Sequence, residues 1–217
     1  PTPVGICSSP SLVIGENQTV YAVYAVSVNE GRGIYINRST NGGREWEDPI
    51  QVFDAQTASW DMIDQPVLAV HGNRIYVHWQ YRSPLDAAVS KGFGYAFSTD
   101  RGLTWSTDEI MTDETLRWSG FVASKNGVLV RTWYPENNEN TIFTNQTSFD
   151  GGQTWSSPIS IANDGLMVGT PELIADANGG IHLLIVLRDS LGKLTLNHWI
   201  RYGEGWTARE KLSLGYN

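Results

Sequence analysis

Four segments of this 217-residue chain repeat one pattern, and the repeat limits the possible folds more than any other feature of the sequence. Each segment is a short apolar strand, a turn containing Gly or Asn, and a longer strand in which apolar residues alternate. The segments read SPSLVIGENQTVYAVYAVS from Ser9, QPVLAVHGNRIYVHWQYRS from Gln65, SGFVASKNGVLVRTWYPEN from Ser119 and TPELIADANGGIHLLIVLRDS from Thr170. Short alternating stretches rich in Val, Ile and aromatic residues favour strands, so we expect an all-β chain with almost no helix.

A third strand, a tight loop ending in Trp and a short fourth strand follow each segment. The residue that opens the first strand and the loop Trp are 36, 39, 35 and 35 positions apart in the four units. Four-stranded antiparallel units repeated in this way are typical of a β-propeller, whose blades bury their faces against one another. We predict a single domain, residues 1–217, with blades at about 9–53, 65–112, 119–162 and 170–214. These blades would form a closed four-blade ring or part of a larger propeller, and a β-sandwich is the alternative architecture.

Three of the four loops share the motif Ser-x-Asx-x-Gly-x-x-Trp. The motif residues are Ser39, Asn41, Gly43, Trp46, Ser98, Asp100, Gly102, Trp105, Ser148, Asp150, Gly152 and Trp155. An Asx side chain can accept hydrogen bonds from nearby amides, Gly supplies a positive φ, and the Ser hydroxyl adds a local bond. The Trp ring is expected to be buried between sheets, with its N–H bonded to an acceptor. We therefore expect these residues to be structural rather than catalytic or metal-binding.

The motif resembles the Asp-box, or bacterial neuraminidase repeat, of β-propellers in the sialidase superfamily. In the fourth unit only Gly203 and Trp206 match it. The resemblance implies a sialidase-like propeller fold. It also implies that the three loops lie on the face away from the ligand.

The opposite face would carry the connections between second and third strands and those between blades. These stretches are long in the sequence, and functional residues concentrate on loops over a rigid scaffold. Trp60 and Trp118 lie in two of the connections between blades, where their rings could stack on a sugar. Packing at the rim between blades is the alternative for both.

Two arginines, Arg82 and Arg188, align at the ends of the second strands of their units. In a four-blade ring they would face each other across the axis and could hold a carboxylate through paired hydrogen bonds. The alternative is that they are solvated arginines paired with Asp86 and Asp189.

Sialidases, as the resemblance implies, use three arginines on the substrate carboxylate, a Tyr–Glu nucleophile pair and an Asp acid/base. The candidates for these roles here are Arg82, Arg117 and Arg188, then Tyr134 with Glu136, and Asp61 or Asp64. The place of the family's Arg-Ile-Pro motif reads Cys7-Ser8-Ser9-Pro10, which has no arginine. The resemblance also implies six blades in a catalytic propeller, whereas this chain supplies four.

Composition excludes several classes of function. The net charge is −8, and only four of the fifteen basic residues are lysines, so we expect no nucleic acid as a partner. Cys7 is the single cysteine, and the four histidines show no metal-ligand spacing, so we expect neither a metal nor a cofactor. The apolar runs are too short to span a membrane.

Three functions follow from these observations. The first is a secreted or cell-surface module that binds a glycan or a protein through its loop-rich face without complete catalytic machinery. The second is a glycoside hydrolase of exo-sialidase type, or a fragment of one. The third is a structural propeller in a surface assembly, and a homodimer that joins the open ends of two chains is a further possibility for all three.

Overall fold

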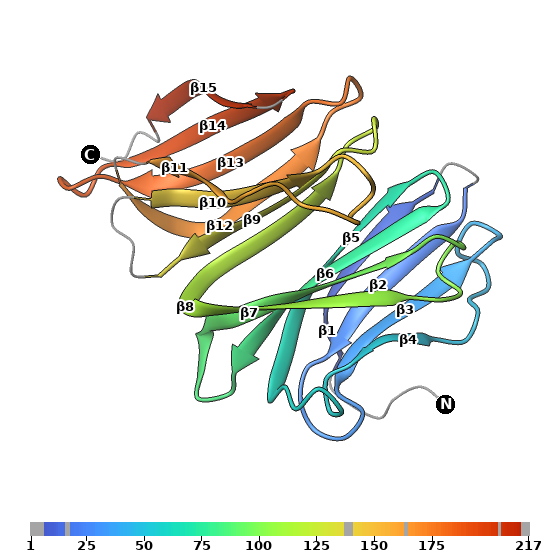
Figure 1. Ribbon diagram of the computed structural model, residues 1–217. Helices are drawn as coiled ribbons and strands as arrows, with labels where there is room; N and C mark the ends of the chain where they lie inside the picture. Colours follow the sequence, from blue (N-terminus) through green and yellow to red (C-terminus); the bar gives the residue numbers. More distant parts are fainter. Residues whose placement is uncertain (1–6, 16–17, 137–140, 163–164, 204, 214–217) are drawn as a thin grey trace. The chain divides into compact units, whose positions relative to one another are not determined.

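The computed structural model describes residues 7–15, 18–136, 141–162, 165–203 and 205–213, and these residues contain strands and no helix (Figure 1). The strands are β1 (Cys7–Ile14), β2 (Val20–Val26), β3 (Gly33–Ser39), β4 (Ile50–Asp54), β5 (Met62–His71), β6 (Arg74–Ser83), β7 (Asp86–Ser98), β8 (Ser106–Ala123), β9 (Leu129–Pro135), β10 (Thr141–Ser148), β11 (Ile159–Ala162), β12 (Leu166–Ala175), β13 (Ile181–Arg188), β14 (Leu194–Tyr202) and β15 (Gly205–Ser213). The prediction of an all-β chain is confirmed. No helix that could cross a membrane is found in the described part of the chain.

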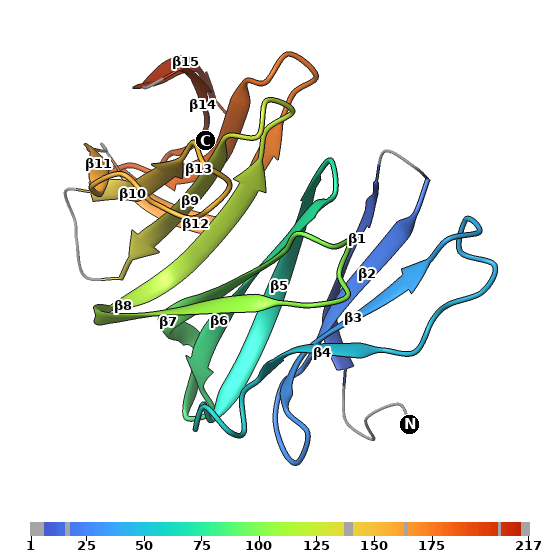
Figure 2. The same cartoon turned by 45° about the vertical axis from the view of Figure 1, so that its right-hand side comes forward.

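Strands pair with their neighbours along the chain, and the registered pairs are antiparallel. Strands β1 to β4 form one sheet in chain order, as both views show (Figures 1 and 2), and β12 to β15 form another. Strands β5 to β11 pair in one continuous series. The predicted strand order is therefore observed, while the count of four blades and the closure of a ring stay predictions.

Two of the connections expected to be long loops, MTDETLRWS (residues 111–119) between blades and RSPLDAAVSKG (residues 82–92) between a second and a third strand, lie largely in strands. The stretch MTDETLRWS lies inside β8, which pairs with β7 as far as Leu116 and then continues beside β9. No Gly or Pro occurs between Thr104 and Ser119 to interrupt it. The stretch RSPLDAAVSKG contains only a short turn, because β6 ends at Ser83 and β7 begins at Asp86.

The chain divides into two compact units, unit 1 (Pro1–Leu116) and unit 2 (Arg117–Asn217). The core of unit 1 is a cluster of aliphatic and aromatic side chains in which Val77, Trp79 and Val23 are fully buried. Unit 2 has a cluster around Phe143, Leu183 and Ile185 and a smaller one around Val130 and Ile181. Each unit thus buries the inward-facing positions of its alternating strands.

The three Ser-x-Asx-x-Gly-x-x-Trp loops share one hydrogen-bond pattern. In the second, Ser98 Oγ donates to Asp100 Oδ1 at 2.7 Å, and the Gly102 amide donates to Ser98 Oγ at 2.7 Å. The amides of Leu103 and Thr104 donate to Asp100 Oδ1 at 3.1 and 2.9 Å. The pKa of Asp100 is held well below its usual range, mainly by the hydrogen bond from the Thr104 hydroxyl and then by these local donors. These side chains therefore bond to the loop itself.

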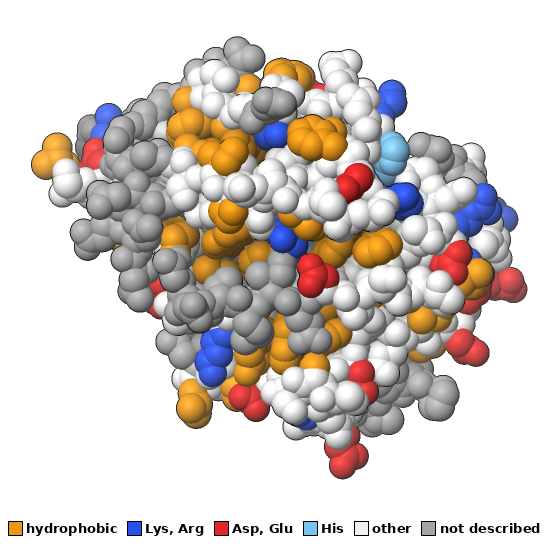
Figure 3. Space-filling view, viewed as in Figure 1, with side chains coloured by type: hydrophobic (Ala, Val, Ile, Leu, Met, Phe, Trp, Pro, Cys, Tyr) orange, Lys and Arg blue, Asp and Glu red, His pale blue; other side chains and the backbone are white. Residues whose placement is uncertain are grey.

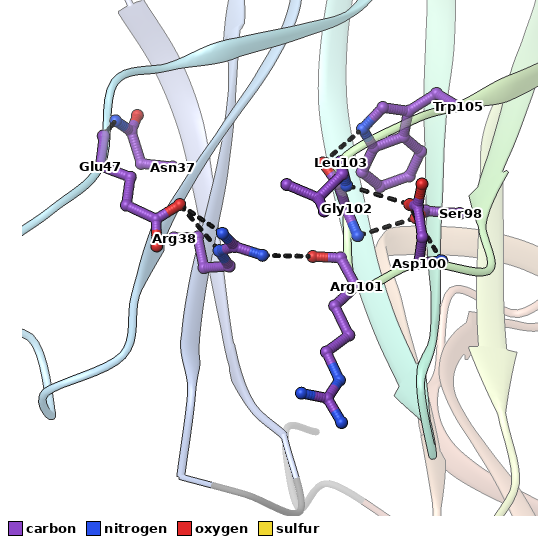
Figure 4. A network of polar contacts seen from close by, with 9 residues as sticks. All are labelled: Asn37, Arg38, Glu47, Ser98, Asp100, Arg101, Gly102, Leu103 and Trp105. Carbon is purple, nitrogen blue, oxygen red and sulfur yellow. Dashed lines mark hydrogen bonds and ion pairs between the residues drawn. The ribbon is translucent and has the colours of Figure 1, made fainter.

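The first and second loops are also linked to each other within unit 1 (Figure 4). Arg38 pairs with Glu47 at 2.6 Å, and its Nη1 reaches the Arg101 carbonyl oxygen at 3.4 Å. The Trp105 indole N–H donates to the Gly102 carbonyl at 3.1 Å, as the sequence suggested. Trp46 is different, because 43% of its surface is exposed, so the expectation that its ring is buried between sheets is wrong.

Candidate functional site

A polar cluster lies in unit 1 where β1 and β5 begin and β2 and β6 end. We call it the Asp64 cluster, and it consists of Ser8, Ser9, Ser27, Asp64, Gln65, Gln80 and Arg82. The antiparallel register brings its members together, because Asp64 lies opposite Gln80 and Met62 lies opposite Arg82. Two of the residues predicted for a site, Asp64 and Arg82, are therefore members of one cluster.

Two bulges shape the cluster. The pairing of β1 with β2 shifts between Ser8 and Ser11, and that of β5 with β6 shifts between Asp64 and Val67. At each bulge a non-glycine residue is left-handed and precedes a proline: Ser9 has φ 51° and Gln65 has φ 52°. Such a backbone costs about 1–3 kcal/mol per residue and is found most often at functional sites. The backbone is therefore strained at the same position of β1 and β5. The side chains of both strained residues belong to the Asp64 cluster.

The Asp64 carboxylate is held by serine hydroxyls. Ser8 Oγ and Ser9 Oγ donate to Asp64 Oδ1 at 2.9 and 2.8 Å, and Ser8 Oγ also lies 2.6 Å from Ser27 Oγ. No described residue donates a hydrogen bond to the second oxygen, Oδ2. Asp64 is half-buried, so Oδ2 can accept a hydroxyl from a ligand.

The Arg82 guanidinium is held by a chain of two glutamines. Its Nη2 donates to Gln80 Oε1 at 3.0 Å, and Gln80 Nε2 donates to Gln65 Oε1 at 2.9 Å. Arg82 is only 9% exposed, and this burial lowers the pKa of its guanidinium, while the charge of Asp64 acts in the opposite direction. An arginine keeps its charge at neutral pH even so. The cluster therefore combines a fixed cation with a fixed carboxylate, a set that can bind neighbouring hydroxyls of a polyol.

Trp60 and Trp118, predicted to stack on a sugar, lie in the cores. Trp60 is 4% exposed, and its ring centroid is 4.9 Å from that of Phe53 and 4.8 Å from that of Tyr81. Trp118 is 7% exposed and packs edge-on against Phe143 in unit 2. A sugar needs an exposed ring face, so the ligand-stacking prediction is wrong for both residues. Their apolar neighbours, which come from other strands, could not be read from local alternation.

The predicted catalytic pair of Tyr134 and Glu136 is not formed among the described residues. The Tyr134 hydroxyl is buried and accepts the Met167 amide at 3.4 Å. The Glu136 carboxylate lies 3.9 Å from Arg117, on the partly exposed surface of unit 2. Both side chains have other contacts here, so their catalytic pairing stays a prediction.

The remaining predicted residues lie outside the Asp64 cluster. Asp61 is exposed and precedes Asp64 by three positions in the sequence. Arg188 is exposed at the end of β13 in unit 2, so its opposition to Arg82 in unit 1 stays a prediction. Asp189 accepts the amides of Leu191 and Lys193, both at 2.9 Å, and the side chain of Asp86 lies outside the described set.

Sequence reasoning missed the serines and glutamines of the cluster. Two signals were available. Ser-Ser-Pro and Asp-Gln-Pro stand at the same place in the first two repeats. In addition, His78, Gln80 and Arg82 put polar groups at every second position, alternating with the apolar residues Val77, Trp79 and Tyr81.

A second polar cluster lies in unit 2, at the turn between β12 and β13. His182 Nε2 is 3.0 Å from Asp176 Oδ2, and His182 Nδ1 is 2.9 Å from His198 Nε2. Tyr202 donates to Asp176 Oδ2 at 3.1 Å, and the two histidine rings stack 5.1 Å apart. The cross-strand register of β13 and β14 brings together two histidines that looked unrelated in the sequence. No group of three or more His, Cys, Asp or Glu in the described ranges is arranged to hold a metal ion.

Asp176 is expected to stabilise unit 2 in a pH-dependent way. The pKa of Asp176 is held well below its usual range, mainly by the hydrogen bond with His182 and then by that from the Gly180 amide. A carboxyl with a lowered folded-state pKa stabilises the fold above its unfolded pKa, near 3.9, and loses this contribution as the pH falls through the folded value. Asp176→Asn should therefore lower the melting temperature at pH 7, with a difference that shrinks as the pH is lowered from 4 toward 2. Melting curves of Asp48→Asn, an exposed aspartate, provide the control, and a difference independent of pH would contradict this role.

No protein-family model matches the chain, and no curated protein matches it in sequence. Solved structures match it. The Hadza microbial sialidase Hz136 aligns with 94% of the chain at a TM-score of 0.64 and 19% identity, and the intramolecular trans-sialidase from Ruminococcus gnavus with 97% at 0.64 and 12%. The GH43_1 enzyme from Xanthomonas citri, complexed with xylotriose, aligns with 97% at 0.60 and 10%.

The chain spans 46% of the first of these structures, 71% of the second and 75% of the third. It therefore covers about half the length of the sialidase. At these identities the likeness concerns the fold alone, and the chain has a sialidase-like β-propeller fold.

Proposed function

We propose that this chain is a carbohydrate-active propeller of Asp-box type that binds a glycan at the Asp64 cluster in a secreted or cell-surface setting. The observation that carries the proposal is the half-buried Asp64 carboxylate, whose Oδ1 accepts hydrogen bonds from Ser8 and Ser9 and whose Oδ2 accepts none from a described residue. Arg82 lies beside it, and two strained bulges hold the arrangement. Similar solved structures include sialidases, a GH43_1 enzyme with xylotriose and an ulvan lyase, which all act on carbohydrates.

Binding without complete sialidase machinery is the function we favour. The buried Tyr134 hydroxyl contacts a backbone amide and Glu136 lies 3.9 Å from Arg117, contacts that do not favour this pair as an activated tyrosine nucleophile. At the start of β1, where the family's Arg-Ile-Pro motif would supply an arginine, Ser8 and Ser9 donate hydroxyl hydrogen bonds to Asp64. Both features support recognition of hydroxyl groups.

A glycoside hydrolase is the alternative, favoured by the geometry of Asp64. A half-buried carboxyl with one oxygen fixed and the other open can serve as an acid or base when a second carboxylate stands at the right separation. Release of reducing sugar from an oligosaccharide panel would identify this activity. In that case Asp64→Asn should abolish release and leave binding measurable.

The proposal is tested by titration calorimetry of the intact chain against a panel that includes xylotriose, cellotriose and 3′-sialyllactose. The panel members that bind should lose about tenfold to a hundredfold in affinity with Asp64→Asn or Arg82→Gln, because a buried polar partner is removed from the contact. Asp48→Asn and Arg44→Gln change exposed residues of the same unit in the same way and should leave affinity unchanged. Binding that none of these variants weakens would place the ligand elsewhere, and absence of any glycan binding would leave a structural propeller as the better function.

A further inference from the structure

The partly exposed members of the Asp64 cluster are the ones that a ligand reaches most easily, and they are Ser8, Ser9, Asp64 and Gln65. Ser8 and Ser9 use their hydroxyl hydrogens on Asp64 Oδ1, and an ionised carboxylate only accepts hydrogen bonds. Gln65 is therefore the partly exposed member whose N–H groups decide whether this part of the cluster can also donate to a ligand.

The orientation of the Gln65 amide follows from its buried neighbours. An arginine only donates, so the Gln80 atom that lies 3.0 Å from Arg82 Nη2 is the oxygen, Oε1. The NH2 group of Gln80 therefore faces Gln65, where Oε1 accepts its hydrogen bond at 2.9 Å. A turned Gln65 amide would bring two NH2 groups together. Gln65 Nε2 is thus the outer end of the chain of amides, and no described residue accepts a hydrogen bond from it.

The backbone of Gln65 explains how its side chain joins the cluster. Asp64 lies opposite Gln80 in the pairing of β5 with β6, and Gln65 bonds to the same Gln80 side chain, although consecutive residues of a regular strand point to opposite faces. The bulge after Asp64 and the φ of 52° at Gln65 make this arrangement. Glycine or asparagine adopts such a φ more easily, so the turn alone does not require a glutamine here.

We infer that Gln65 is a ligand-binding residue, whose Nε2 donates to an oxygen of the bound sugar, and that Arg82 positions it through Gln80. The inference rests on the proposed glycan-binding function and adds the donor to the acceptor that Asp64 Oδ2 supplies. A sugar hydroxyl both donates and accepts, so a pair of neighbouring hydroxyls can use Asp64 and Gln65 together.

Two variants of Gln65 test its contact with the ligand. Gln65→Glu keeps an oxygen for Gln80 Nε2 and replaces the outer NH2 group by an oxygen, whereas Gln65→Met removes the donor without adding a charge. Titration calorimetry with the panel members that bind should show about a tenfold loss of affinity for both, the size expected for one hydrogen bond. Melting curves check that each variant is folded.

Gln18 provides the matched control, because it is an exposed glutamine of unit 1 with a left-handed backbone, φ 62°. Residues 1–116 contain fourteen Asp and Glu, and acidic side chains are spread over the lower right of the space-filling view (Figure 3). One further carboxylate therefore changes the overall field little. Gln18→Glu and Gln18→Met should leave the affinity unchanged.

The positioning role of Arg82 is tested by a double-mutant cycle and by NMR. In the Gln65→Met background, Arg82→Gln should weaken binding by less than about twofold, because its effect passes through the side chain already removed. The side-chain NH2 signal of Gln65 in the 15N-labelled chain is identified by its loss in Gln65→Glu. This signal should move when the ligand is added, and it should also move in Arg82→Gln without ligand.

The outcomes separate the inference from the function on which it rests. Binding that Asp64→Asn weakens, but that both Gln65 variants leave within about twofold, would overturn the ligand contact of Gln65 and keep the proposed function. Additive effects of Gln65→Met and Arg82→Gln, or a Gln65 signal that stays in place in Arg82→Gln, would overturn the positioning by Arg82. If no panel member binds, the proposed function fails and the ligand contact of Gln65 fails with it.

Discussion

Trp60→Ala is expected to lower the free energy of unfolding by about 3–5 kcal/mol, the usual cost of truncating a buried aromatic side chain. The Trp60 ring lies between those of Phe53 and Tyr81, and its backbone amide donates to the Ala55 carbonyl at 2.8 Å. The Trp60 carbonyl accepts Arg32 Nε at 2.6 Å, so the side chain fills a site whose backbone is fixed on both sides. The cavity left by alanine cannot easily collapse, and urea unfolding followed by circular dichroism would measure the loss.

Trp46→Ala is the matched control, because 43% of the Trp46 surface is exposed. Its effect should be about 1 kcal/mol or less. The opposite pattern, in which Trp60→Ala keeps the stability of the protein and weakens a glycan instead, would show that the Trp60 ring faces a ligand after all. This pair of variants therefore tests the burial of Trp60 directly.

Gly94→Ala is expected to have an effect of similar size for a steric reason. Gly94 lies opposite Trp79 in the pairing of β7 with β6, and a Cβ at this position would come within 2.2–2.4 Å of three atoms of the Trp79 indole. Trp79 is fully buried, so its ring has no free space in which to move. Overpacking of this severity should cost about 3 kcal/mol or more, measured as a shift of the urea midpoint.

Two further variants identify the cause of the Gly94 effect. Gly205→Ala adds the same methyl group where no heavy atom lies within 4 Å, and it should change stability by about 0.5 kcal/mol or less. The double variant Gly94→Ala with Trp79→Phe removes the indole atoms that clash, so it should be more stable than the sum of the two single changes predicts. Strict additivity would contradict a direct contact between the new methyl group and the Trp79 ring.

The strand pattern of this chain was largely readable from the sequence because it is local. Alternation along VYAVYAV and RIYVHWQYRS, and the Gly and Asn turns between strands, depend on neighbours a few residues away. The Ser-x-Asx-x-Gly-x-x-Trp loops are local for the same reason, and the bonds around Asp100 follow from residues within four positions of it. At β8 the expected boundary failed because no Gly or Pro marks the end of a strand there.

The candidate site was only partly readable. Arg82 was found through its place at a strand end, and Asp64 only as an alternative to Asp61 for the acid/base that the family resemblance implies. The surroundings of Asp64 were not found, because they depend on Ser8, which is 56 positions from Asp64, and on the left-handed backbone of Gln65. A bulge of one residue changes which side chains share a face, and no pattern in a single strand reveals it.

The sequence by itself determined that the chain is a series of antiparallel strands in chain order with three matching turns, because alternation and turn chemistry act over a few residues. The tertiary structure alone decided that Trp60 and Trp118 belong to the cores and that Ser8, Ser9 and Asp64 meet beside Arg82. The physical reason is that burial and polar contact depend on which residues of separate strands meet, and at the Asp64 cluster the bulges in β1 and β5 contribute to this.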